Sequence, residues 1–388
     1  MIEDRIEELN QKLVDEIIKR NKEIFNNEIS SEIIELFKKI KRHLFIEELW
    51  EQNEKTGKWE CFKIDFKNPQ EEILKKIYVD TPLVIAIKNE NVFSTSSQPS
   101  LMGYMLELSE IKKNDIVLEI GTGSGYNASL ISEIVGEENV FTVEIDHSIA
   151  VMAKRNIQRC GKKINVICGD GSKFYPDKNY NSVIVTCATP DIYWYKNIVD
   201  GGIVVIPLLT RGLEMLCKFK KIKNKFYGEV KLPVRFLTFA GINMILSDYK
   251  RNIEALGKLL LKGEKLEELS SEFTSLPPIK RVSFLFYLSL IEEDAIYYLP
   301  LKNEFPEGYG IWKKVFPQGI VLITRDGITH FGDKSVVDKL VKHFEEFKKK
   351  NITYRDFKIE AVKEKPERLS KDDIVVQKKF NTFIFRLK

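Results

Sequence analysis

The sequence predicts an α/β fold with a doubly wound, mostly parallel sheet, preceded by N-terminal helices and followed by a C-terminal α+β domain. Between residues 116 and 207, short apolar runs alternate with segments of helical periodicity. Strands that are apolar on both faces and connected by helices form parallel sheets covered on both sides. A glycine-rich turn directly follows the first apolar run, and such sheets bind ligands at the carboxyl ends of their strands.

The composition is that of a folded protein with a large core. Of the 388 residues, 43% are apolar and 30% are charged, which excludes intrinsic disorder and collagen-like structure. There are 61 Lys and Arg against 57 Asp and Glu, a net charge of +4. Because the two signs are balanced, we expect no nucleic-acid partner. The length indicates roughly two or three domains.

The cysteines and the N-terminal residues indicate a reduced, intracellular protein. Five cysteines without a Cys-x-x-Cys pair argue against a disulfide framework and against a metal site. The first 45 residues are charged throughout, unlike a secretory signal. Since the strongest apolar run, residues 203–209, is far shorter than the roughly 20 residues that span a bilayer, we expect a cytoplasmic protein without a membrane segment.

Residues 1–78 form the expected N-terminal helical segment, with an irregular end. Apolar residues recur at helical spacing from Ile6 to Ile17. A second helix is predicted near residues 30–40, where a serine at the start is a suitable N-cap.

Residues 79–240 form the expected core domain. Its predicted strands cover residues 116–120, 140–145, 164–168, 183–187 and 203–207, and its predicted helices cover 126–135 and 148–160. After this alternation, residues 213–222 and 226–236 are expected to pair as antiparallel strands across a Lys-Asn-Lys turn.

Residues 241–388 form the expected C-terminal α+β domain. Asp326-Gly327 separates two β-rich runs, which is a strong hairpin signal. An amphipathic helix is predicted over 335–350, and residues 354–362 and 382–387 alternate as strands. The domain could cover the active-site cleft, mediate self-association or hold a substrate; the sequence leaves these roles and the oligomeric state open.

The sharpest motif is the segment Glu119-Ile120-Gly121-Thr122-Gly123-Ser124-Gly125-Tyr126, between a predicted strand and a predicted helix. Glycines let the backbone turn tightly and approach a ligand closely. A dinucleotide-binding loop needs its third glycine one residue later, at the position of Tyr126. The carboxylate of Glu119 also disfavours a nearby pyrophosphate and suits a cationic ligand. We therefore favour S-adenosylmethionine over a nicotinamide dinucleotide or a purely structural turn.

Two further acids follow the next two predicted strands. Glu144 ends the second strand, where a carboxylate can accept both hydroxyls of a ribose. Asp170, between Gly169 and Gly171, follows the third strand, where it can face an adenine amino group. Acids at the ends of three successive strands predict a single ligand-binding edge.

A second motif, Ser94-Thr95-Ser96-Ser97-Gln98-Pro99, precedes the glycine loop. Pro99 suits the first turn of a helix, and Ser97 or Gln98 suits its cap. Taken alone, the motif could be a simple helix cap. The four histidines are scattered, so nothing in the sequence supports a nucleophilic serine.

These segments, in this order, resemble the protein-L-isoaspartate O-methyltransferase family. The resemblance covers residues 40–240 and rests on Arg42-His43-Leu44-Phe45-Ile46, Tyr78-x-Asp80-x-Pro82-Leu83, Thr95-x-Ser97-Gln98-Pro99, the glycine loop, Gly169-Asp170-Gly171 and residues 201–207. The Thr-x-Ser-Gln-Pro turn is more specific than the glycine loop, which most methyltransferases of this fold share. The chain departs from the common form in its long C-terminal extension, which longer members also have, and in Ser96, where an aliphatic residue is usual.

The resemblance implies a Rossmann-like class I methyltransferase that uses S-adenosylmethionine to methylate the free carboxylate of L-isoaspartyl residues in damaged proteins or peptides. It implies that Ser97 is the catalytic residue, which orients that carboxylate, and that Gln98 and Pro99 bind substrate beside it. The residues expected to bind the cofactor are Ser94, Thr95, Ser96, Ser97, Met102, Glu119, Gly121, Thr122, Gly123, Gly125, Tyr126, Asn127, Glu144, Asp170 and Gly171.

Two alternatives remain open at this point. An enzyme of the same fold could modify aspartate or isoaspartate in a ribosomally made peptide during its maturation. A non-catalytic module could keep the cofactor fold for binding alone.

Overall fold

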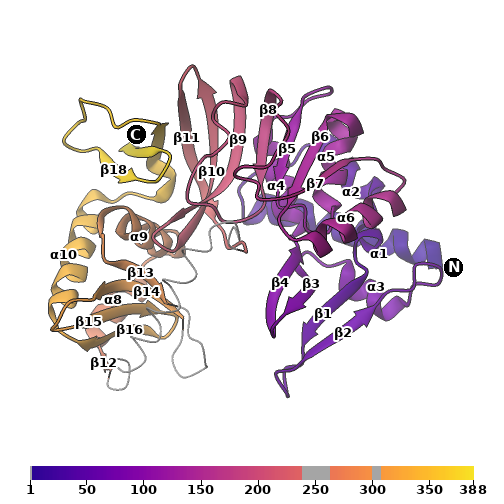
Figure 1. Ribbon diagram of the computed structural model, residues 1–388. Helices are drawn as coiled ribbons and strands as arrows, with labels where there is room; N and C mark the ends of the chain where they lie inside the picture. The colour runs from indigo at the N-terminus through magenta and orange to yellow at the C-terminus, as the bar shows by residue number, and fades with distance from the viewer. Residues whose placement is uncertain (1, 238–262, 299–306) are drawn as a thin grey trace.

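The computed structural model describes residues 2–237, 263–298 and 307–388. Figure 1 shows two lobes: one contains a large sheet with helices around its parallel half, and a smaller one at the lower left consists of C-terminal residues. The predicted α/β class is confirmed. Within the described residues, no helix has both the length and the apolar character needed to cross a membrane.

Five parallel strands form the half of the main sheet that carries the glycine loop. They are β5 Val117–Ile120, β6 Val140–Glu144, β7 Asn165–Cys168, β8 Tyr180–Val185 and β9 Ile198–Thr210, in the order β7-β6-β5-β8-β9. Helices α5 Tyr126–Val135 and α6 His147–Arg159 connect the first three strands, as predicted. Because β5 lies between β6 and β8, the chain changes direction across the sheet at β5, and such switch points are where these sheets bind ligands.

Five antiparallel strands extend the same sheet to ten strands. β10 Leu213–Ile222 and β11 Lys225–Pro233 form the predicted hairpin, and β17 Phe357–Val362, β19 Thr382–Leu387 and β18 Ile374–Gln377 follow in that order. β17 pairs with β11 and covers the N–H and C=O groups that an edge strand would leave unpaired. The structure therefore differs from the expected division at residue 240, since the last strands of the chain return to the core sheet.

The N-terminal part contains helices and a second sheet. Helices α1 Ile2–Glu23 and α2 Ser31–Lys39 lie where they are predicted, and η1 Arg42–Phe45 and α3 Glu71–Ile77 follow. Four antiparallel strands, β1 Glu48–Gln52, β2 Trp59–Lys63, β3 Leu83–Lys88 and β4 Asn91–Ser96, form the sheet in the order β2-β1-β3-β4. The expectation of a helical segment over 1–78 thus misses two strands, because β1 and β2 are short and half polar and carry no long apolar run. Helix α4 Pro99–Ser109 follows β4.

A five-stranded antiparallel sheet and helices form the smaller lobe. Its strands are β12 Glu264–Lys265, β13 Ala295–Tyr298, β14 Gly308–Lys313, β15 Gly319–Thr324 and β16 Gly327–Gly332, and its helices are α8 Glu267–Ser275, α9 Pro278–Ile291 and α10 Ser335–Lys350. The β15–β16 hairpin and α10 are predicted correctly. Helix α9 joins the lobes, because its Phe286 ring lies 5.5 Å from Phe357 in the main sheet while Phe284 lies 4.9 Å from Phe344 of α10.

A buried arginine fixes the segments that lead to the site. The guanidinium of Arg42 is 0% exposed and donates to the carbonyl oxygens of five residues. These are Ile77 at 3.1 Å, Val79 at 2.6 Å, Thr81 at 2.8 Å, Ser96 at 3.4 Å and Ser97 at 3.1 Å. Burial lowers the pKa of Arg42 to about 10, which still leaves it charged at neutral pH. One side chain thus ties the end of α3, the loop before β3 and the turn after β4 together.

Replacing Arg42 by Met is expected to lower the free energy of unfolding by at least about 3 kcal/mol, because each buried carbonyl left without a donor costs about 1–3 kcal/mol. Urea unfolding followed by circular dichroism measures the change. The matched control is Arg5→Met, which removes solvent-accessible ion pairs with Glu8 and Glu71 and should change the free energy of unfolding far less. If the two variants lose the same stability, Arg42 does not have this role.

Candidate active site

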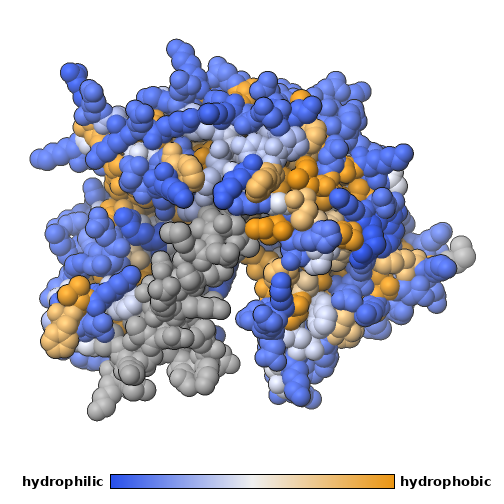
Figure 2. Space-filling model, in the orientation of Figure 1, coloured by the Kyte–Doolittle hydropathy of each residue, from blue (hydrophilic) through white to orange (hydrophobic). Residues whose placement is uncertain are grey.

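A cavity opens at the carboxyl ends of the parallel strands, beside the turn that follows β4. It encloses about 950 Å³, including its open mouth. It is lined by residues 93–97, 120–124, 126–127, 143–146, 169, 171 and 186–187, with Met102, Ile149 and Leu237. In Figure 2, apolar side chains gather on the visible face between the regions that Figure 1 labels β7 and β4. A partly apolar cavity of this size suits a small-molecule ligand.

The glycine loop takes backbone conformations that favour glycine. The φ angles are +97° at Gly121, +52° at Gly123 and +84° at Gly125. A Cβ on Gly125 would lie 2.9 Å from Ile157 of α6, and a Cβ on Gly123 would lie 3.0 Å from the carbonyl oxygen of Thr95 in β4. The loop therefore needs glycine both for its turn and for its close contact with a neighbouring helix and strand.

Glu119 lies beneath this loop and does not line the cavity. Its Oε1 accepts a hydrogen bond from Nδ2 of Asn127 at 2.7 Å, and its Oε2 accepts one from the hydroxyl of Thr142 at 2.6 Å. The Thr142 hydroxyl is also 2.7 Å from that of Thr122 in the loop. Burial raises the pKa of Glu119 to about 7. The carboxylate thus holds both the loop and Asn127 from below.

The chemistry of the cavity wall suits a cationic ligand. Oδ1 of Asn127 is buried and has no partner among the described residues, although Asn127 lines the cavity. The charged side chains among the described lining residues are both acidic, Glu144 and Asp146. A free acceptor and two carboxylates favour positive charge and N–H groups, and they oppose a pyrophosphate. The wall therefore fits S-adenosylmethionine, which carries a sulfonium and an ammonium and no phosphate.

Glu144 ends β6 at the edge of the cavity, as the sequence predicts. Its Oε2 accepts a hydrogen bond from the N–H of Gly123 at 3.0 Å, and its Oε1 accepts one from the N–H of Asp146 at 3.3 Å. Burial raises the pKa of Glu144. Each carboxylate oxygen can accept a second hydrogen bond, so a pair of ribose hydroxyls can bind without displacing these contacts.

Asp170 closes the turn after β7. Its Oδ1 accepts hydrogen bonds from the N–H of Ser172 at 2.9 Å and from the Ser172 hydroxyl at 2.7 Å. Gly169 and Gly171, on either side of it, line the cavity, whereas Asp170 does not. The carbonyl oxygen of Gly171 accepts a hydrogen bond from the indole of Trp194 at 2.7 Å.

The turn after β4 meets the glycine loop, so the two sequence motifs form one site. The hydroxyl of Ser124 in the loop donates to Oγ of Ser96 at 3.3 Å. Ser97 lines the cavity, and its hydroxyl makes no hydrogen bond to a described residue, while Arg42 holds its carbonyl oxygen from behind. The Ser97 hydroxyl is therefore free to bind a ligand in the cavity.

The similarity to known proteins extends over most of the chain. The family model described as protein-L-isoaspartate(D-aspartate) O-methyltransferase matches residues 62–243. The protein-L-isoaspartate O-methyltransferase of Thermotoga maritima is 31% identical over an alignment of 303 residues, and the match covers 74% of this chain and 86% of that protein. The chain belongs to the protein-L-isoaspartate O-methyltransferase family.

Further relatives agree with this membership. The protein of the same name from Ignicoccus hospitalis is 37% identical over 173 residues, covering 43% of this chain and 80% of its own. A solved structure of a protein-L-isoaspartate O-methyltransferase is 25% identical and has a TM-score of 0.52. It covers 90% of this chain and 96% of its own, so the match includes the C-terminal extension.

Two residues predicted to bind the family's substrate lie away from the cavity. Gln98 and Pro99 are not among its lining residues. Nε2 of Gln98 donates to the carbonyl oxygen of Asp80 at 3.0 Å and to its Oδ2 at 3.1 Å. Oδ1 of Asp80 accepts the N–H of Ser100 at 2.8 Å and so caps α4. Both residues shape the turn that carries Ser97, and their contact with substrate remains a prediction.

Several residues that line the cavity are absent from the sequence prediction. They are Phe93, Ile120, Val143, Ile145, Asp146, Ile149, Gly169, Thr186, Cys187, Ser124 and Leu237. The side chain of Thr186 donates to the carbonyl oxygen of Gly121 at 2.6 Å, which ties β8 to the loop. Ile145, Thr186 and Cys187 directly follow strands, so the rule that parallel strands end at one edge could have found them. No sequence signal marks Leu237.

Glu119 is expected to give the fold a specific pH dependence. Its pKa is about 7 in the folded protein against an ordinary value of 4.5, so the folded state binds the proton more tightly. The stability from this group is full below the unfolded pKa and is lost as pH rises through the folded pKa. The free energy of unfolding of wild type minus that of Glu119→Gln should therefore fall between pH 5 and pH 8, measured by urea unfolding. A difference that stays flat over this range would contradict the assignment.

Proposed function

We propose that this chain methylates isoaspartyl carboxylates at the cavity described above, with Ser97 orienting the carboxylate and Glu144 holding the ribose of the cofactor. The single observation that supports this best is the free Ser97 hydroxyl, which faces the same cavity as the glycine loop and Glu144. The activity itself is that of the family: methyl transfer from S-adenosylmethionine to the free carboxylate of L-isoaspartyl residues.

The reaction needs placement more than acid–base catalysis. A carboxylate has a reference pKa near 4, so at neutral pH it is already the nucleophile. S-adenosylmethionine, when bound, supplies the methyl group as an activated sulfonium. The protein must hold the carboxylate oxygen in line with that methyl group and exclude water. A Ser97 hydroxyl that donates to one carboxylate oxygen leaves the other free to react.

The cofactor assignments follow from the cavity wall. The unpartnered Oδ1 of Asn127 is a suitable acceptor for the ammonium group, and Glu119 fixes that side chain from below. Ile145, 42% exposed at the end of β6, offers an apolar face for the adenine ring beside Gly169 and Gly171. Asp170 then acts through the shape of its turn. Ser94, Thr95, Ser96, Met102, Thr122 and Tyr126 line the rest of the cavity.

The proposed role is repair of aged proteins. In a methylated isoaspartyl residue the following amide nitrogen attacks the ester carbonyl and expels methanol, which forms a succinimide, and hydrolysis of that ring returns some normal aspartate. The C-terminal extension gives no reason to prefer tailoring of a dedicated peptide, because relatives named for isoaspartate methylation cover it as well. All five cysteines are free thiols, which supports our proposal of a reducing, cytoplasmic setting.

Two otherwise identical peptides test the function, one with L-isoaspartate and one with L-aspartate. The purified protein and methyl-labelled S-adenosylmethionine should give base-labile label on the isoaspartyl peptide alone. Label on neither peptide, with cofactor binding intact, would count against repair and favour a dedicated peptide partner.

Ser97→Ala is expected to lower kcat roughly 10- to 100-fold, because a hydrogen bond to a charged group contributes about 1.5–3 kcal/mol. The Kd for the cofactor, from calorimetry, should change little. The control is Ser109→Ala at the other end of α4, whose hydroxyl binds only within its helix. A kcat within twofold of wild type would exclude the role given to Ser97.

Glu144→Ala is expected to raise the Kd for S-adenosylmethionine roughly 10-fold or more, because two charge-assisted hydrogen bonds to the ribose are lost. Calorimetry measures the Kd directly. Glu133→Ala serves as the control, since that carboxylate pairs with Lys39 and Lys162 away from the cavity. Unchanged cofactor binding in Glu144→Ala would remove the ribose assignment.

A further inference from the structure

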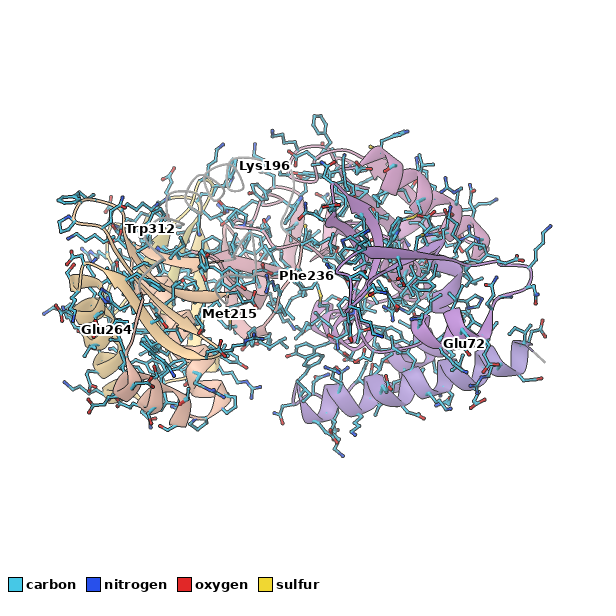
Figure 3. The ribbon with its side chains drawn as sticks, turned by 90° about the horizontal axis from the view of Figure 1, so that it is seen from below. Glu72, Lys196, Met215, Phe236, Glu264 and Trp312 are labelled. Carbon is cyan, nitrogen blue, oxygen red and sulfur yellow. The ribbon has the colours of Figure 1, made fainter. Side chains whose placement is uncertain are left out.

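The segment after β8 bounds the cavity on the side from which an acceptor must approach. The cofactor's nucleoside end belongs at β6 and β7, so the opposite side, beyond β8, remains for the acceptor. Cys187 lines the cavity there, and the N–H of Ala188 donates to the carbonyl oxygen of Leu237 at 3.0 Å. Leu237 is a cavity residue too, and Figure 3 shows the adjacent Phe236 between the two lobes.

A buried acid ties this segment to the C-terminal end of the chain. Oδ2 of Asp191 accepts the N–H of Phe380 at 2.7 Å, and its Oδ1 accepts the N–H of Ile192 at 3.0 Å and the side-chain amide of Asn381. The amide of Asn381 also donates to the carbonyl oxygen of Ile192 at 2.8 Å. Asp191 and Asn381 are each 1% exposed. The turn between β18 and β19, residues 378–381, is therefore fastened onto the segment after β8.

This turn presents an aromatic side chain on the acceptor side of the site. Phe380 is 50% exposed, and its ring packs T-shaped against Tyr193 with centroids 5.2 Å apart. Asp191, which holds this turn, follows the cavity residue Cys187 in the segment after β8. Phe380 is thus fixed to the segment that leaves the cavity beyond β8, and it still offers half of its surface to a partner.

We propose that the turn 378–381 is a docking element for the isoaspartyl polypeptide, with Phe380 as its apolar contact and the Asp191–Asn381 pair as its anchor. This proposal rests on the proposed function. A repair enzyme meets isoaspartate in many sequences, so a flexible substrate needs a contact outside the reacting residue that does not read its sequence. An exposed aromatic ring beside the site provides such a contact. The C-terminal extension then contributes directly to substrate binding.

Phe380→Ala tests the docking contact, because it removes the ring and keeps the backbone N–H that Asp191 binds. The KM for an isoaspartyl peptide should rise roughly fivefold or more, while kcat and the Kd for S-adenosylmethionine stay within twofold of wild type. The matched control is Phe316→Ala, which removes a ring that is 90% exposed on the β14–β15 loop. The control should leave all three values unchanged. An unchanged peptide KM in Phe380→Ala, an equal change in both variants, or a weaker cofactor affinity would overturn the proposal.

A binding measurement separates this proposal from the proposed function. Fluorescence anisotropy of a labelled isoaspartyl peptide reports docking without turnover, and Phe380→Ala should weaken that binding to the same extent as it raises KM. If wild type binds the peptide but does not methylate it, the proposed function fails and docking stands. If wild type methylates the peptide and Phe380→Ala binds it equally well, docking fails and the function stands.

The anchor has its own test. Asn381→Leu should raise the peptide KM as Phe380→Ala does, because the turn loses its attachment to Asp191. The effect should be confined to KM, with kcat and the Kd for S-adenosylmethionine within twofold of wild type, because Asn381 touches neither the cofactor nor the reacting carboxylate. If Asn381→Leu leaves the peptide KM unchanged, or changes kcat or the cofactor Kd as much as KM, the pair does not position the docking turn.

Discussion

The site depends on one buried charge, the guanidinium of Arg42, which backbone carbonyl oxygens surround in place of water. Three of these oxygens belong to the end of α3 and the loop before β3, and two belong to Ser96 and Ser97. The charge therefore sets where β4 ends and, with it, where the free hydroxyl of Ser97 lies relative to the glycine loop. A backbone held in this way can present a side chain to a ligand without relying on that side chain for its own structure.

The charges at the cavity are also held by neutral hydrogen-bonding groups. The acids that define the ligand edge are held by N–H, amide and hydroxyl donors, as Glu119 and Glu144 show, and no described Lys or Arg lines the wall. A cavity of this kind keeps its negative potential for an incoming cation and does not neutralise it internally. This negative potential distinguishes the cavity from phosphate-binding sites, whose glycine loops begin with a similar sequence.

Much of the parallel core could be predicted from the sequence, because apolar runs indicate strands and glycines indicate tight turns without reference to distant residues. The left-handed turn at position 125, packed against α6, requires glycine, and Glu144 lies at the end of its strand as expected. Three kinds of feature could not be predicted in this way. β1 and β2 are too short and polar to stand out, Gln98 is recruited by Asp80 at a distance in the sequence, and β17 joins a strand about 130 residues earlier. Each of these features depends on a partner elsewhere in the chain, which a local sequence pattern does not indicate.

The return of the last strands to the main sheet has a consequence for how the molecule is made. During synthesis, residues up to Pro233 leave the ribosome long before Phe357–Val362 can pair with β11. Until then the growing sheet ends in a bare β11, a surface open to association with other chains. Proteolytic removal of residues 357–387 would recreate that surface in a finished molecule. β11 is therefore covered only once β17 has been made, and the edge of the sheet then lies at β18.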